Sequence, residues 1–249
     1  MLSRFVMIAY QTRYLLIALG LCMLSLAACQ APPVVTDLEA YDFEDPTAPT
    51  TMPSPASLYT LKSDSIKLMV TAGDGVGEVV NIDVTKVNDD ADFPYRRALP
   101  GDRIEHVGYA ADGSIIVGAV EDLSHNVITY FDPPMPLLPV NLKPDEPQSF
   151  KSKMKIVSRK NPQMVTDTGE ASKTITHDAD QTVVTPVGKF KAYRVHATYT
   201  AVLKTARVQT AEDAWYNPKL GLVAERDSET VTALILQWTN KKTIIRSQR

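Results

Sequence analysis

Hydrophobic and polar residues alternate along much of this chain after residue 57, with the two-residue period of a β-strand. Residues 65–73 and 77–87 are rich in β-branched residues and bounded by glycines, a composition typical of strands. In residues 149–157, Phe150 and Met154 alternate with lysines, which predicts a half-buried strand with a cationic outer face. The same reasoning predicts further strands within residues 102–120, 126–131, 181–205, 211–226, 230–238 and 241–246.

Turn residues join these predicted strands into hairpins. The pair Asp112-Gly113 separates two apolar-rich runs and is a strong hairpin signal. After a predicted turn at residues 186–189, the longest strand carries large residues that share one face because they are separated by even numbers of positions. These residues are Tyr193, Val195, Tyr199 and Leu203. Together with Trp215 of the next hairpin, they are predicted to face a ligand or to belong to the core.

A proline-rich segment divides the predicted strands. Six prolines fall within residues 133–147. Because proline cannot donate a ladder hydrogen bond, we expect no central strand here, but a crossing between two β-rich halves, residues 58–132 and 148–249. Its leucines would be unusual in a solvated linker and are expected to pack on the body; they are Leu137, Leu138 and Leu142.

The expected fold is therefore mostly β. No segment predicts an amphipathic helix longer than three turns, and the hairpin signals favour antiparallel pairing. The sequence predicts a strongly curved sheet or half-barrel, either continuous or divided into the two β-rich halves joined by the proline-rich crossing.

The N-terminal segment has the features of an export signal. Arg4 and Arg13 precede an uncharged run over residues 14–28, which is shorter than the roughly 20 residues that a membrane span needs. The four residues Leu26-Ala27-Ala28-Cys29 resemble a bacterial lipobox. That resemblance implies a signal peptide over residues 1–28, a diacylglyceryl group on the Cys29 sulfur and an acyl chain on its amine. The alternatives are an ordinary signal peptide cut after Ala28 and an uncut anchor.

The resemblance also implies a location. In the sorting rule of enterobacterial lipoproteins, aspartate after the lipidated cysteine retains the protein in the inner membrane, and Gln30 stands there in this chain. We therefore expect a lipid anchor in the outer membrane and a body on the periplasmic face. Residues 29–57 are rich in proline and acidic residues, and they are predicted to form an extended or disordered tether. Tyr41 and Phe43 could instead anchor a docking segment.

Charge and cysteine content narrow the chemistry. The chain has a formal net charge of -3, which gives no general attraction for nucleic acid. Its cysteines, Cys22 and Cys29, both precede the predicted body, so the body is expected to contain neither a disulfide nor a thiolate metal site. The four histidines are not spaced as metal ligands, and no Gly-x-Ser-x-Gly motif is present. No catalytic residue and no cofactor is predicted apart from the lipid on Cys29.

Three segments together resemble a group of uncharacterised bacterial envelope proteins. They are "PPMPLLPVNLKP" at 133–144, "TPVGKFKAYRV" at 185–195 and "WYNPKLGLVAE" at 215–225. The resemblance covers residues 133–237 and implies a curved antiparallel sheet of the kind found in the lipoprotein carriers LolA and LolB. Gly188, Phe190 and Pro218 have the chemistry of turn and packing residues, which favours a role in the fold.

The functional hypothesis is a non-enzymatic lipoprotein whose curved sheet binds a partner protein or an apolar ligand. One alternative is a structural or assembly accessory of an envelope complex, docked through an exposed strand edge. The other is a hydrolase with a site that no motif reveals. The oligomeric state and the identity of the partner or ligand stay open.

Overall fold

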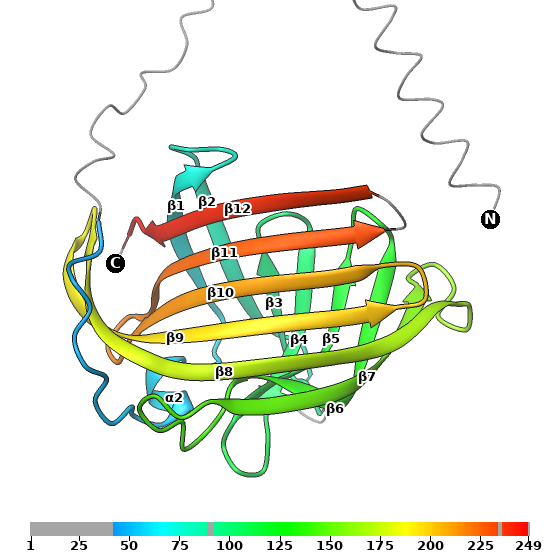
Figure 1. Cartoon of the computed structure of the whole chain (residues 1–249), viewed down its shortest axis with the longest axis horizontal. Helices are drawn as coiled ribbons and strands as arrows, with labels where there is room; N and C mark the ends of the chain where they lie inside the picture. The colour runs from blue at the N-terminus through cyan, green and yellow to red at the C-terminus, as the bar shows by residue number, and fades with distance from the viewer. Residues whose placement is uncertain (1–41, 89–91, 234–235, 249) are drawn as a thin grey trace, which may run out of the picture. The chain divides into compact units, whose positions relative to one another are not determined.

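The computed structural model describes residues 42–88, 92–233 and 236–248, so the signal segment, Cys29 and Gln30 lie outside the described residues. Twelve strands pair antiparallel in sequence order, and the last returns to the first (Figure 1). They are β1 (Asp64–Gly73), β2 (Val79–Lys86), β3 (Tyr95–Leu99), β4 (Arg103–Tyr109), β5 (Ile115–Asp122), β6 (Val127–Leu138), β7 (Gln148–Ser158), β8 (Val165–Thr185), β9 (Gly188–Leu203), β10 (Arg207–Asn217), β11 (Gly221–Ala233) and β12 (Leu236–Arg246).

The predicted mostly β, antiparallel fold is confirmed, but the sheet closes into a barrel, whereas a strongly curved sheet or half-barrel was predicted. β1 pairs with β12 over a register that runs from Leu68 opposite Arg246 to Gly73 opposite Lys242. The β-rich halves expected from the sequence are therefore consecutive arcs of one barrel, joined both at β6–β7 and at β1–β12. Alternation of residue types indicates which face of a strand is buried, but it does not indicate whether the first and last strands meet.

Several strand boundaries also differ from the prediction. β8 begins at Val165, well before the predicted start at residue 181, and β3 was not predicted. The apolar run 230–238, predicted as one strand, belongs to two: β11 ends at Ala233 and β12 begins at Leu236. No glycine or asparagine interrupts that run, so the sequence carries no turn signal there.

The expectation that no strand passes through the proline-rich segment is wrong. β6 continues through Pro133, Pro134 and Pro136 to Leu138. The strand pairs with β7 only up to Asp132, and its last part pairs with β5 alone. On the β7 side no ladder bond is required there, so proline is tolerated as it is on an edge strand. The predicted burial of the three leucines is confirmed: Leu137, Leu138 and Leu142 are all buried.

The predicted tether is not extended away from the body over residues 42–57. We call residues 42–63 the N-terminal strap. Phe43 and Thr47 form bridges with Val183 and Asp180 of β8, and the blue segment follows this part of β8 in Figure 1. Because β7 pairs with β8 only as far as Ile175, the following edge of β8 is free to take the strap. That partner lies more than a hundred residues away, so local composition could not reveal it.

The strap then enters the barrel. It forms the short helix α2 (Pro55–Leu58), and three of its apolar side chains are buried in the main core: Leu58, Tyr59 and Leu61. The Tyr59 ring lies edge-on to Tyr216, near the C-terminal end of β10, with 6.2 Å between centroids. No helix in the described ranges is long and apolar enough to cross a membrane.

Candidate functional site

A cavity of about 250 Å³ lies inside the barrel, away from the end that the strap fills. Its volume approaches the lower limit of roughly 300 Å³ for typical small-molecule pockets. Inward-facing positions on β5, β6, β7, β9 and β10 supply most of its apolar lining, which we call the apolar wall; they are Val117, Val120, Phe131, Met135, Leu137, Met154, Ala197 and Val208. A barrel of twelve strands is wider than those of about eight strands, whose interiors side chains just fill, so its centre leaves room for a ligand.

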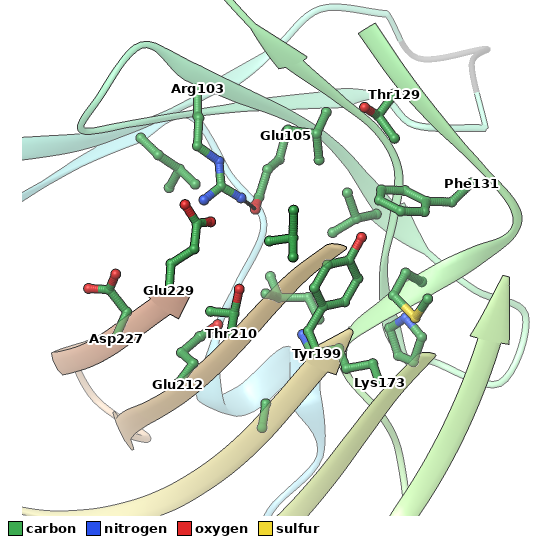
Figure 2. Close-up of a pocket in the computed structure, with 18 of the residues that line it drawn as sticks. Arg103, Glu105, Thr129, Phe131, Lys173, Tyr199, Thr210, Glu212, Asp227 and Glu229 are labelled. Atoms are coloured by element: carbon green, nitrogen blue, oxygen red, sulfur yellow. Dashed lines mark ion pairs between the residues drawn. The ribbon is translucent and has the colours of Figure 1, made fainter. Parts of the chain in front are cut away.

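Another part of the cavity lining is strongly acidic. Four carboxylates of the neighbouring strands β10 and β11 form this acidic wall: Glu212, Glu225, Asp227 and Glu229. A fifth, Glu105 of β4, lies beside Val120 in the β4–β5 register. The cations in the lining are Arg97, Arg103 and Lys173. Figure 2 shows Glu212, Asp227 and Glu229 on one side of the cavity and Phe131 and Tyr199 on the other. The cavity is therefore amphipathic, with charge concentrated on the strands β4, β10 and β11.

Both arginines of the cavity contact the same carboxylate. Arg97 Nη1 lies 3.2 Å from Glu105 Oε2, and Arg103 Nη2 lies 3.8 Å from Glu105 Oε1. The Arg97 and Glu105 side chains are almost fully buried, whereas the Arg103 side chain is 48% exposed. Arg103 therefore lies where the cavity meets solvent.

The remaining carboxylates have no such partner. Within the described part of the chain, Glu212, Glu225, Asp227 and Glu229 form no hydrogen bond or ion pair through their carboxylates. Burial, and next the charge of Glu212, raise the pKa of Glu225 to about 8. The same two causes raise the pKa of Asp227. Lys242, opposite Asp227 on β12, and Arg103 act to lower the Asp227 pKa, and Arg97 acts to lower the Glu225 pKa, but burial and the neighbouring carboxylates outweigh them.

The residues predicted to face a ligand or form the core occupy four environments. Tyr199 lines the cavity, its hydroxyl lies 3.7 Å from Met154 Sδ, and burial raises its pKa to about 12. Val195 is in the main core with Tyr193 packed against it, and Leu203 packs on the Met154 cluster.

Trp215 lies on the opposite face of the sheet, because its neighbours Ala214 and Tyr216 belong to the main core. Its ring packs on Phe43 of the strap at 4.3 Å, and Nε1 donates a hydrogen bond to Gln181.

Sequence reasoning did not identify the acidic wall. Its signal was present in the segment 211–226, where Glu212 shares a face with Ala214 and Glu225 pairs with Ala214 across the hairpin. A carboxylate on the apolar face of a strand is unusual unless it is paired or lines a cavity.

Three of the histidines contact carboxylates or backbone carbonyl oxygens. His106 Nε2 lies 2.9 Å from Glu121, and His196 Nδ1 lies 2.7 Å from Asp213. The buried His177 ring contacts the Arg194 and Thr50 carbonyl oxygens, each at 3.0 Å, and so joins the strap to the barrel.

His125 lies beside a serine and an aspartate, the residue types of a catalytic triad. Ser124 Oγ and Asp122 both approach His125 Nδ1, at 3.1 and 2.7 Å. A catalytic triad needs the nucleophile and the acid on different ring nitrogens, so this exposed turn does not have that geometry. Across the described ranges, no group of three or more His, Cys, Asp or Glu residues is placed to hold a metal ion.

Comparison with known proteins gives weak similarities. No protein-family model matches the chain, and no curated protein matches its sequence. A proposed lipoprotein from Parabacteroides distasonis has a solved structure similar to this chain, with a TM-score of 0.35 and 12% identity over 77% of this chain and 98% of that one. The hypothetical lipoprotein YmcC from Escherichia coli gives a TM-score of 0.35 and 10% identity over 80% and 100%. The function of this chain has to rest on its own residues.

Proposed function

We propose that the barrel is a binding protein for a small, largely apolar molecule held in its internal cavity. One observation carries the proposal: many apolar side chains and a cluster of carboxylates line one open space at the centre of a closed barrel. Ligand pockets combine such apolar lining with a few convergent polar groups. In this proposal the protein is not an enzyme.

The proposal includes a lipid anchor at Cys29, supported by the lipobox-like residues 26–29. Gln30 supports the outer membrane and its periplasmic face as the location. Because the strap begins at Asp42, only twelve residues separate it from Cys29, and these could span at most about 40 Å. The wild-type chain should incorporate labelled palmitate and remain with membranes. Incorporation that persists in Cys29→Ser would contradict the anchor.

Native mass spectrometry after gentle extraction tests the ligand. The wild-type protein should retain a small apolar molecule that Ala197→Phe excludes, since this change fills the cavity from β9. Thr198→Phe is the matched control, because Thr198 is the next residue on the same strand and is exposed on the other face. An apolar molecule retained equally by both variants would contradict binding in the cavity.

A second candidate function is that of an assembly accessory. β1 pairs with β12 only from Lys242 onward, so among the described residues the start of β12 pairs with β11 alone. Trp238 lies on this edge and is 53% exposed. An extended segment of an envelope protein could add as a further strand. A crosslinker at Trp238 should capture a partner that Asn240→Pro releases, and one at Tyr130 should not. Equal capture at both positions would contradict this function.

A further inference from the structure

We infer that the ligand of the cavity carries a positively charged group, such as an amine or a guanidinium, on an apolar body. This inference rests on the proposed function, because it concerns the same cavity. It follows from how the acidic wall is built, from the excess of carboxylates over cations in the cavity lining and from the apolar side chains around it.

The acidic wall is a cross-strand ladder. Glu225, Asp227 and Glu229 are separated by two residues along β11, so they share one face. Glu212 of β10 lies directly opposite Asp227 in the register. Directly opposed side chains in an antiparallel pair have Cβ atoms about 5 Å apart, and like charges at that distance are destabilising. A ladder of this kind is retained at a cost to stability, which a bound cation would offset.

The positive charges near the cavity offset this ladder only in part: Lys242 of β12 lies opposite Asp227 in the register, and Lys242 and Arg103 both act to lower the Asp227 pKa, which is nevertheless raised. Arg97 and Arg103 both contact Glu105. Lys173 comes from β8, and within the described part of the chain its amine forms no ion pair with the ladder. Five carboxylates thus share the lining with three cations, two of which contact the same acid.

A buried acceptor without a hydrogen bond points to the same kind of ligand. Glu105 is only 8% exposed, yet its Oε2 accepts no hydrogen bond despite the nearby Arg97 guanidinium. Buried polar atoms are normally satisfied, so this oxygen indicates that a hydrogen-bond donor belongs beside it. A ligand nitrogen with N–H donors would satisfy Glu105 and the ladder together.

The rest of the cavity favours an organic cation over a metal ion. No described group of three or more His, Cys, Asp or Glu residues has the arrangement of a metal site. Phe131 and Met135 of β6 form part of the apolar wall and offer only apolar contact. A metal ion would leave that wall without a partner, whereas the apolar body of an amphiphile would cover it.

Isothermal titration with three ligands of one chain length tests the inference. Octylamine, octanol and octanoate share an apolar body and differ in charge. At a pH above about 8, where Glu225 is ionised, octylamine should bind roughly tenfold or more tightly than octanol. Octanoate should bind most weakly of the three, because its carboxylate meets the ladder.

The outcomes separate the inference from the proposed function. If octanol binds as tightly as octylamine, or octanoate binds best, the inference is wrong and the apolar binding function stands. If no ligand of the series binds, the function fails and the inference fails with it. The double variant Glu212→Gln/Glu225→Gln should reduce the ratio of octylamine to octanol affinity, whereas Glu170→Gln on the exposed outer face should not. An unchanged ratio in the double variant would also overturn the inference.

Discussion

Arg97 and Glu105 form an ion pair inside the barrel, with 3.2 Å between a guanidinium nitrogen and a carboxylate oxygen. Both side chains are nearly excluded from solvent, and the guanidinium also lies over the Tyr59 ring of the strap at 5.5 Å. The pair thus connects the plugged end of the barrel to the cavity, and the contact partner of the Arg97 guanidinium is Glu105 and not a carboxylate of the ladder on β10 and β11.

Replacing one member of this pair should destabilise the fold strongly. Arg97→Met leaves Glu105 buried without its main partner, which typically costs about 3–5 kcal/mol in the free energy of unfolding. Chemical denaturation measures the change. The double variant Arg97→Met/Glu105→Met should recover most of the loss, because it removes both charges. If Arg97→Met were as stable as wild type, the ion pair would not contribute to the stability of the fold.

Stability should fall with rising pH because of Glu225. Its folded-state pKa is raised from the ordinary value of 4.5 to about 8, so the folded chain holds this proton more tightly than the unfolded chain. The favourable contribution is fully present below about pH 4.5 and declines as the pH rises through about 8.

The causes of that shift act from several elements: Glu212 of β10, Asp227 of β11, Glu105 of β4 and, in the opposite direction, Arg97 of β3. Denaturation at a series of pH values should give a flatter decline for Glu225→Gln than for wild type. Glu170→Gln, on the exposed outer face, should leave the slope unchanged. Identical slopes for wild type and Glu225→Gln would contradict the burial of this carboxyl.

His196 should titrate above its ordinary range. The hydrogen bond to Asp213 raises the His196 pKa, although burial opposes it. For Asp213, burial acts upward, but hydrogen bonds from His196 and Arg226 outweigh it and lower the pKa. The stability from His196 is fully present below about pH 6.5 and lost as pH rises through the folded pKa, while that from Asp213 is lost as pH falls below 3.8.

An NMR titration of the histidine ring protons measures the pKa of His196 directly. Asp213→Asn should move the His196 midpoint to lower pH, and Asp122→Asn, which changes the surroundings of His125, should not. A His196 midpoint that is insensitive to Asp213→Asn would rule out the pairing in solution.

We expect Phe43 to hold the strap against the barrel. Phe43→Ala removes the ring that covers Trp215 and should lower the free energy of unfolding by about 1–3 kcal/mol. This is less than the roughly 3–5 kcal/mol lost when a fully buried phenylalanine is replaced by alanine. In a Trp238→Phe background, which removes the exposed tryptophan, the emission of Trp215 should shift to longer wavelength. Tyr130→Ala, at a side chain that is already 43% exposed, is the control. Unchanged emission would mean that the strap does not cover Trp215.

The sequence predicted local structure better than long-range pairing. The Asp112-Gly113 turn lies between β4 and β5 as expected, with Gly113 at a φ of 91° that favours glycine. By contrast, the pairing of β1 with β12 joins the two ends of the body, and nothing in the residues near Leu68 or Arg246 specifies it. The prolines of β6 led to the wrong prediction that no strand passes there. A strand tolerates proline where no neighbour pairs with it, and the sequence does not show that the pairing with β7 stops at Asp132.

The candidate site escaped prediction for a related reason. Glu105, Glu212 and Glu225 come from three strands, and each alone resembles an ordinary surface acid. Only the closed barrel brings them to one cavity, where burial changes their chemistry. Tyr199 could be assigned to the inward face from alternation alone, but a packed core and a cavity wall have the same pattern.

Methionine methyl groups give the most direct test of the central claim that a ligand binds inside the barrel. Met135 and Met154 line the cavity, whereas Met69 packs in the cluster around Trp215 and Met164 is 56% exposed. In a spectrum of methyl-labelled methionine, adding octylamine should shift the Met135 and Met154 signals and leave those of Met69 and Met164 in place. Shifts confined to Met69 or Met164, or no shift at Met135 and Met154, would contradict the account.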